Sequence, residues 1–194
     1  MMVALALLIL AAEPSSEWKD EGSRQGIPIE GRAVPGSRFS EFRASMEISG
    51  DANVLCDAVF IWASSAGNSP EVSKRTVLED RGDVRLVHDE LKTPIVSDRA
   101  VTFLLTKKRP SPGLCTLEAH VDNQRAPKIP ESFVRITKMD TSWRFEPGTN
   151  GKTKVTFAIF VDPAGSVPPF LTYGAQRNAA ADTLKAALEK VTSK

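Results

Sequence analysis

Few residues of this 194-residue chain could do acid–base chemistry near neutral pH, because it contains only two histidines, His88 and His120. Nucleophilic catalysis needs a serine or cysteine beside a base and an orienting acid, and the sequence has no G-x-S-x-G motif. His120 falls on the polar phase of its predicted strand. His88 lies two residues before Glu90, so these two could form an acid–base pair if both faced a cavity. The sequence therefore favours a protein that is not an enzyme, with the His88–Glu90 pair as the alternative.

Composition excludes several classes of partner. The chain has 25 Lys and Arg against 24 Asp and Glu, so its net charge is +1, and the two signs are scattered along it. This pattern lacks the basic surface of a nucleic-acid-binding protein. A hydrophobic content of 41% and this length fit one ordinary globular domain, which we expect over residues 17–192 as a monomer.

Two cysteines, Cys56 and Cys115, belong to no metal-spaced cluster, so we expect neither a metal nor another cofactor. In an exported chain they could form a disulfide. They fall on different predicted elements, however, and the sequence favours two buried, unpaired small hydrophobic residues.

The N-terminal segment, residues 1–12, is uninterruptedly apolar ("MMVALALLILAA"). It is shorter than the roughly twenty residues of a membrane-spanning helix and suits the core of a secretory signal, although no Lys or Arg precedes it. We therefore expect a periplasmic or secreted protein, or a cytoplasmic one if this segment is not a signal.

The remaining sequence has a clear order of elements. Three short strands are predicted near Glu17–Glu21, Ile27–Val34 and Arg38–Ile48, and Asp51 is placed to cap a helix after them. That helix would present one face made of Val54, Ala58, Ile61 and Trp62. Residues 73–162 then alternate with period two over six segments, of which "FVRITKMDTSWRFEP" is one.

A long helix is predicted from about Val167 to Val191, after two consecutive prolines. Strands in succession form an antiparallel sheet, and a sheet of about nine strands curls. The expected fold is therefore α+β, with the last helix covering the concave face. Gly174, Asn178 and Ala181 lie at the middle of the helix face that should be buried. Because these side chains are small, we expect space for a ligand beneath them.

The segments "GIPIEGRAVPGSRFSEFRA", "DVRLVHDEL", "VSDRAV", "GKTKVTF" and "DPAGSVPPFL", in this order and spacing, resemble the START (StAR-related lipid-transfer) domains, especially small bacterial ones. The resemblance covers about residues 17–191. It implies a helix-grip fold with an internal hydrophobic cavity for one lipid or other apolar molecule, which is bound and transported with transient membrane contact. It also implies an entrance between the C-terminal helix and the loop Leu91–Asp98. The alternative from the same superfamily is a cyclase- or aromatase-like enzyme acting on a polyketide- or steroid-like substrate.

The predicted strand faces and the resemblance together give a set of candidate ligand-binding residues. The alternating apolar positions would equally fill a solid core, and the resemblance favours a lined cavity. The candidates are Leu86, His88, Glu90, Val101, Phe103, Leu105, Leu117, Ala119, Val121, Phe157, Ile159, Phe170, Leu171, Gly174, Asn178 and Ala181.

Two positions depart from the pattern that the resemblance implies. Glu90 matches an acidic residue that faces the tunnel in sterol-binding relatives, but Leu105 stands where its basic partner is expected. Glu90 could therefore face the cavity, or a one-residue bulge could place it outside. In "VSDRAV", Ala100 replaces a second acid, and we expect Asp98 and Arg99 to form an ion pair that anchors the entrance loop.

Overall fold

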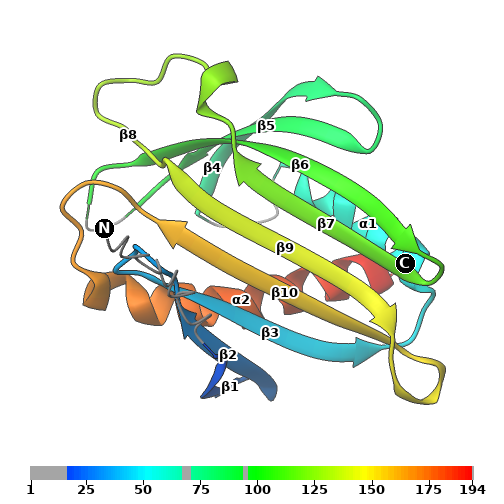
Figure 1. Ribbon diagram of the computed structural model, residues 1–194. Coiled ribbons are helices and arrows are strands. Elements are labelled where there is room, and N and C mark those ends of the chain that lie inside the picture. Colours follow the sequence, from blue (N-terminus) through cyan, green and yellow to red (C-terminus); the bar gives the residue numbers. More distant parts are fainter. Residues whose placement is uncertain (1–16, 67–70, 94–95, 194) are drawn as a thin grey trace, which may run out of the picture.

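The computed structural model describes residues 17–66, 71–93 and 96–193 (Figure 1). The predicted signal, residues 1–12, lies outside this part, as do two residues of the predicted entrance loop, 94 and 95. The helices and strands are β1 (Lys19–Arg24), β2 (Ile27–Ala33), β3 (Ser40–Ile48), α1 (Ala52–Ala63), β4 (Val72–Asp80), β5 (Val84–Leu91), β6 (Arg99–Ser111), β7 (Leu114–Val121), β8 (Val134–Arg135), β9 (Lys138–Pro147), β10 (Thr153–Asp162) and α2 (Pro169–Thr192), with two 3-10 turns, η1 (Asn123–Arg125) and η2 (Thr149–Gly151).

All the strands form one sheet. Nine of them follow an antiparallel path in the order β1-β2-β3-β10-β9-β7-β6-β5-β4, and the two-residue strand β8 pairs with β6 in parallel. The predicted α+β fold is thus confirmed, with ten strands instead of about nine. The additional strand arises because the segment predicted as one strand, "FVRITKMDTSWRFEP", is divided into β8 and β9.

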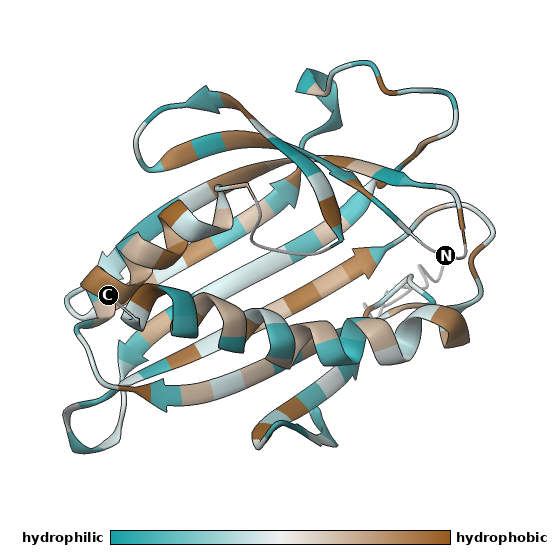
Figure 2. Ribbon diagram, turned by 180° about the vertical axis from the view of Figure 1, so that it is seen from behind, coloured by the Kyte–Doolittle hydropathy of each residue, from teal (hydrophilic) through white to brown (hydrophobic). Residues whose placement is uncertain are grey.

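Both helices lie on the same face of the sheet, its concave inner face, and Figure 2 shows them in front of the strands. Helix α2 contacts β2, β3 and β10, while α1 contacts β7, β9 and α2. The helix-grip arrangement therefore follows from a curled sheet that closes around α2. The side chains between these layers form one buried cluster, whose largest fully buried members include Phe42, Phe145, Ile29, Leu117, Leu184, Leu188, Val59 and Val87.

Helix α1 begins as predicted, because the Asp51 carboxylate accepts hydrogen bonds from the backbone N–H groups of Asn53 (2.9 Å) and Val54 (3.1 Å). The predicted buried face is wrong. Val54 and Ile61 are exposed, and the helix instead buries Ala52, Leu55, Cys56, Val59 and Phe60. Because α1 is apolar on nearly every side, periodicity could not decide which face packs.

Cys56 in α1 and Cys115 in β7 form a disulfide, so the prediction that they stay unpaired is wrong. Both residues are fully buried, as expected. The bond joins α1 to the inner face of the sheet across 59 residues of sequence. It therefore fixes the position of α1 against β7.

Candidate functional site

The candidate site is the inner face of the sheet beneath α2. Three strands present their predicted apolar side chains to the buried cluster, and only Val121 and Ile159 of this group are partly buried at its margin. The predicted strand faces are thus correct for Val101, Phe103 and Leu105 of β6, Leu117, Ala119 and Val121 of β7, and Phe157 and Ile159 of β10. Whether they contact a ligand stays a prediction.

Strand β5 faces the other way from the prediction. In its register with β6, Val87 pairs with Phe103 and Asp89 pairs with Val101, so Val87 and Asp89 lie on the inner face. Leu86, His88 and Glu90 lie on the outer face, and the expectation that they line the ligand space is wrong. The bulge that was considered for Glu90 is not needed, because the whole strand is in the opposite phase.

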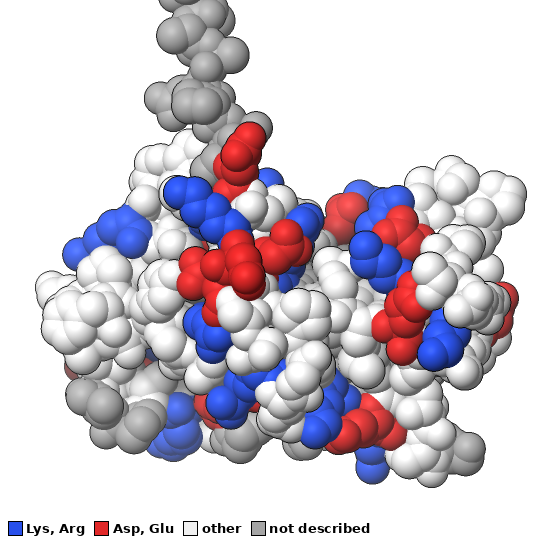
Figure 3. Space-filling view, turned by 90° about the horizontal axis from the view of Figure 1, so that it is seen from below, with Lys and Arg blue, Asp and Glu red and all other residues white. Residues whose placement is uncertain are grey.

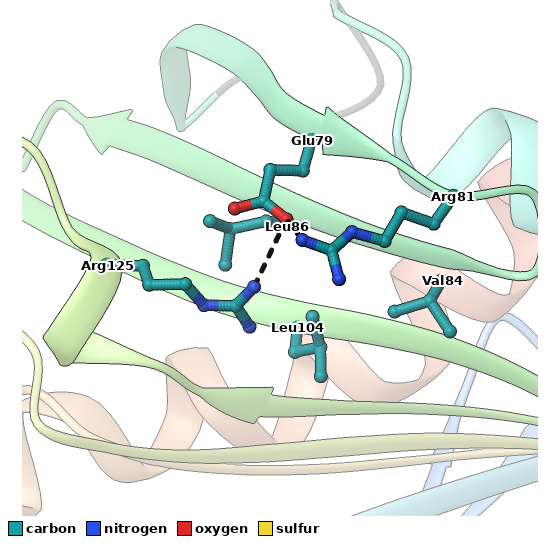
Figure 4. Close-up of a pocket in the computed structure, with 6 residues that line it drawn as sticks. All are labelled: Glu79, Arg81, Val84, Leu86, Leu104 and Arg125. Atoms are coloured by element: carbon teal, nitrogen blue, oxygen red, sulfur yellow. Dashed lines mark hydrogen bonds and ion pairs between the residues drawn. The ribbon is translucent and has the colours of Figure 1, made fainter.

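Leu86 instead lines a small hollow of about 110 Å³ on the outer face. Figure 4 shows it beside Val84 and Leu104, below the Glu79 carboxylate. Arg81 and Arg125 both donate to Glu79 Oε2, at 2.7 and 3.3 Å. A second, shallow hollow lies over Glu118, His120 and Asp140. Both hollows are outside the space between the sheet and α2.

A buried ion pair, Arg75–Asp89, is the main polar feature of the inner face. Arg75 Nε donates to Asp89 Oδ1 at 2.7 Å, and a second guanidinium nitrogen donates to Asp89 Oδ2. The side chains are only 8% and 5% exposed. Arg75 also donates to the Ala63 carbonyl at 2.6 Å and lies 6.0 Å from the centre of the Phe103 ring.

Sequence reasoning missed this pair. The signal was an aspartate inside an otherwise apolar strand, but its partner is on β4, 14 residues earlier, rather than on the following strand. Burial of an unpaired charge costs several kcal/mol. The two hydrogen bonds of this bidentate pair give each of the two charges its partner. The inner face therefore carries a mutually neutralised ion pair beside the apolar side chains of β6, β7 and β10.

His88 is buried on the outer face, at 5% exposure, and its Nδ1 lies 2.8 Å from Thr102 Oγ1. Burial lowers the pKa of His88 below its ordinary value of 6.5, Glu90 opposes this shift, and the Arg135 charge adds to it. Glu90 forms an exposed ion pair with Lys74 (3.3 Å). The acid–base pair proposed for an internal cavity is therefore not on the inner face.

The two halves of α2 are packed differently. The second half buries Ala180, Ala181, Leu184, Ala187 and Leu188 against the core. In the first half, Phe170 is 77% and Leu171 50% exposed, and a side chain at Gly174 would meet open space. Phe170, Leu171 and Gly174 are therefore not part of a buried lining, contrary to the prediction.

Polar contacts also hold α2 to the edge of the sheet. Arg177 Nε donates to the Glu21 carbonyl at 2.9 Å, and Arg24 pairs with Asp182 at 2.6 Å. Gln176 donates to the Val161 carbonyl at 2.8 Å. Asn178, which was predicted to contact the ligand, is partly buried and accepts a hydrogen bond from Arg177 (2.8 Å). The helix is thus tied to β1 and β10 from its second turn onward.

Asp98 and Arg99 do not pair with each other, so that prediction is wrong. Asp98 pairs with Lys92 at 2.5 Å. Arg99 is buried and donates to the Pro163 carbonyl at 2.8 Å, to the Ser97 carbonyl and, at 3.5 Å, to the Ala164 carbonyl. Its guanidinium therefore connects the loop before β6 with the loop before α2.

The described residues contain no group of three or more His, Cys, Asp or Glu side chains placed to hold a metal ion. Neither helix in this part of the chain has the length and apolarity that a bilayer crossing requires. Figure 3 shows positive and negative side chains interspersed on the lower face, with much uncharged surface where α2 begins.

Solved structures share this fold. The chain superposes on a StAR-related lipid-transfer protein from Xanthomonas axonopodis with a TM-score of 0.78 and 22% identity, over 90% of this chain and 98% of that one. Human StAR-related lipid transfer protein 5 gives a TM-score of 0.71 and 16% identity, over 93% and 88% of the two chains. The lipid-transfer and protein-localization domain of human StarD13 gives 0.69 and 20%, over 91% and 89%.

At the level of sequence, the chain is 22% identical over 172 residues to an uncharacterised protein of Pseudomonas aeruginosa. The matched region covers 88% of this chain and 85% of that protein. No family model matches the chain. The predicted resemblance is thus confirmed in the fold, which is the helix-grip fold of the START domains.

Proposed function

We propose that this protein binds one lipid or other apolar molecule between the inner face of its sheet and α2, and carries it through an aqueous compartment. The fold supports this proposal, because similar solved structures are named as lipid-transfer proteins. The inner face is apolar along β6, β7 and β10, as a site for a hydrocarbon chain requires.

The observation that carries the proposal is the uneven packing of α2. A helix that only completed a core would bury its apolar residues along its whole length, since each buried leucine or phenylalanine contributes about 2 kcal/mol. Here the first turn leaves Phe170 and Leu171 exposed, and Val96 is also exposed in the loop before β6. Tyr173 follows them and is partly exposed, but its ring packs against Phe42 at 5.1 Å. The first turn, which precedes the contacts of Tyr173, Gln176 and Arg177 with the sheet, can contact a membrane and move to admit a ligand without disturbing the buried half.

The Arg75–Asp89 pair gives the site a means of selecting ligands. A purely apolar wall accepts many shapes, and the few polar groups in it determine which ligands are favoured. A ligand hydroxyl or carbonyl could share hydrogen bonds with this pair at the inner end of the site, near Phe103.

Export of the protein is part of the proposal. The Cys56–Cys115 disulfide fits an oxidising compartment such as the periplasm, because thiols in the cytosol are usually kept reduced. The apolar segment at residues 1–12 is consistent with a secretory signal.

Native mass spectrometry of the purified protein, followed by lipid extraction, tests ligand binding. We expect one lipid per chain that is released on denaturation. Phe103→Arg should abolish this binding, because it places an unpaired charge in the apolar wall. Thr106→Arg on the same strand is the control, because Thr106 pairs with Val84 on the outer face. If the purified protein takes up no lipid from vesicles or detergent, the proposed function is wrong.

A further inference from the structure

Arg99 is a second buried arginine on the inner face, at the end of the site where the loops meet. It is the first residue of β6 and pairs with Leu91, which packs against the core, while Val101 and Phe103 follow on the same face. Arg99 is only 4% exposed. A side chain in this position adjoins both the apolar wall and the two loops before β6 and α2.

Among the described residues, the hydrogen-bond acceptors of Arg99 are backbone carbonyls. Nε donates to Pro163 O, Nη1 to Ser97 O and Nη2 to Ala164 O. These contacts orient the guanidinium but do not neutralise it. A guanidinium has five N–H groups, so two have no acceptor among the described residues and are available to a ligand.

The charge of Arg99 has no counter-ion among the residues that the structure describes. No ion pair joins it to a carboxylate there, and the adjacent Asp98 is occupied by Lys92. Burial lowers the pKa of Arg99, whereas a nearby carboxylate would raise it. The other buried arginine of the inner face, Arg75, has the Asp89 carboxylate as its partner.

A buried charge without a counter-ion is costly, and an anionic ligand would offset this cost. We propose that Arg99 binds the anionic headgroup, a carboxylate or a phosphate, of an amphipathic ligand whose chain lies along Val101 and Phe103. This inference rests on the proposed function. It makes Arg99 the residue that determines headgroup preference, at the end of the site nearest the loops.

Matched ligands that differ only in headgroup charge test the inference. We would measure the affinity of the delipidated protein for palmitic acid and hexadecanol at about pH 8, and for dipalmitoyl phosphatidate and dipalmitoylglycerol. We expect one or both anionic ligands to bind about tenfold or more tightly than their neutral counterparts, because hydrogen bonds to charged groups contribute that much. The pair that shows the preference identifies the headgroup as carboxylate or phosphate.

Two variants locate the preference. Arg99→Gln should remove it, whereas Arg38→Gln should keep it, because Arg38 donates to the Gly165 carbonyl in the same loop from an exposed position. If Arg99→Gln does not fold, Arg99→Lys keeps the charge and should retain a reduced preference. Equal affinity of the unmodified protein for charged and neutral ligands would overturn the role of Arg99 and leave the proposed function standing. Binding of none of the four ligands would count against both.

Discussion

The end of the molecule around α1 and the end around the start of α2 contact the same inner face of the sheet in different ways. At the first, which we call the closed end, the Cys56–Cys115 disulfide, the Arg75–Asp89 pair and the second half of α2 fix the helices to the sheet. At the second, the open end, Phe170 and the residues after it leave apolar side chains exposed.

The difference separates two requirements of a lipid carrier. A stable fold needs buried contacts, which the closed end provides, while uptake and release need a part that moves at low cost. Because α2 spans both ends, its first turn can shift while the rest of the helix, held by Gln176, Arg177 and the buried second half, keeps the fold intact.

The largest effect should come from loss of the disulfide. In the chain-entropy model, a bond that closes 59 residues stabilises a protein by about 4 kcal/mol. Reduction, or replacement of Cys56 and Cys115 by alanine, should therefore lower the free energy of unfolding by up to this amount. Urea denaturation with and without reductant measures it. An unchanged midpoint would show that α1 is held without the bond.

Removal of the Asp89 charge should lower the free energy of unfolding nearly as much. Asp89→Asn leaves the buried Arg75 without a counter-ion and should cost about 3 kcal/mol of stability. Glu90→Gln is the matched control, and its exposed pair with Lys74 should contribute less than about 1 kcal/mol. Thermal unfolding of both variants compares them, and a larger loss for Glu90→Gln would mean that β5 has the opposite phase.

The two halves of α2 can be compared directly with two leucines. Leu184→Ala should cost about 3 kcal/mol, because Leu184 is fully buried, whereas Leu171→Ala should change stability by less than about 0.5 kcal/mol. The rate of lipid transfer between vesicles should show the opposite order, so that Leu171→Ala slows transfer more than Leu184→Ala does. Equal stability losses would remove the distinction between the ends.

A drop in pH should have the smallest effect on the free energy of unfolding. The folded-state pKa of His88 is lowered, so the unfolded chain binds its proton more readily, and stability should fall as the pH drops below 6.5. His88→Gln should remove this part of the pH dependence. Denaturation between about pH 5 and pH 8 measures it. Lipid affinity should not follow the His88 titration, because His88 is outside the proposed site.

The sequence was sufficient to predict which face of a strand points inward where apolar and polar residues mostly alternate. Val101, Phe103 and Leu105 on β6 alternate with Thr102, Leu104 and Thr106, and because two of the latter three are polar, the inward face was predicted correctly. The order of strands and helices followed from the same periodicity, and with it the fold. A two-residue period fixes a strand face only when one phase is clearly apolar.

Strand β5 and the cysteines show why the rest could not be predicted. In "VRLVHDEL", Leu86 and Val87 are both apolar, and the inward phase is set by the distant Arg75. Whether Cys56 and Cys115 pair depends on α1 packing on β7, which no local pattern encodes. The apolar positions at the start of α2 look the same in sequence whether they are buried or exposed.

Amide hydrogen exchange along α2, measured with and without bound lipid, tests the central claim most directly. The account predicts that the amides of residues 170–176 exchange much faster than those of residues 180–188, and that lipid or vesicles protect the first group most. Uniform protection along the whole helix, unchanged by lipid, would show that α2 is a fixed wall and that ligands enter elsewhere.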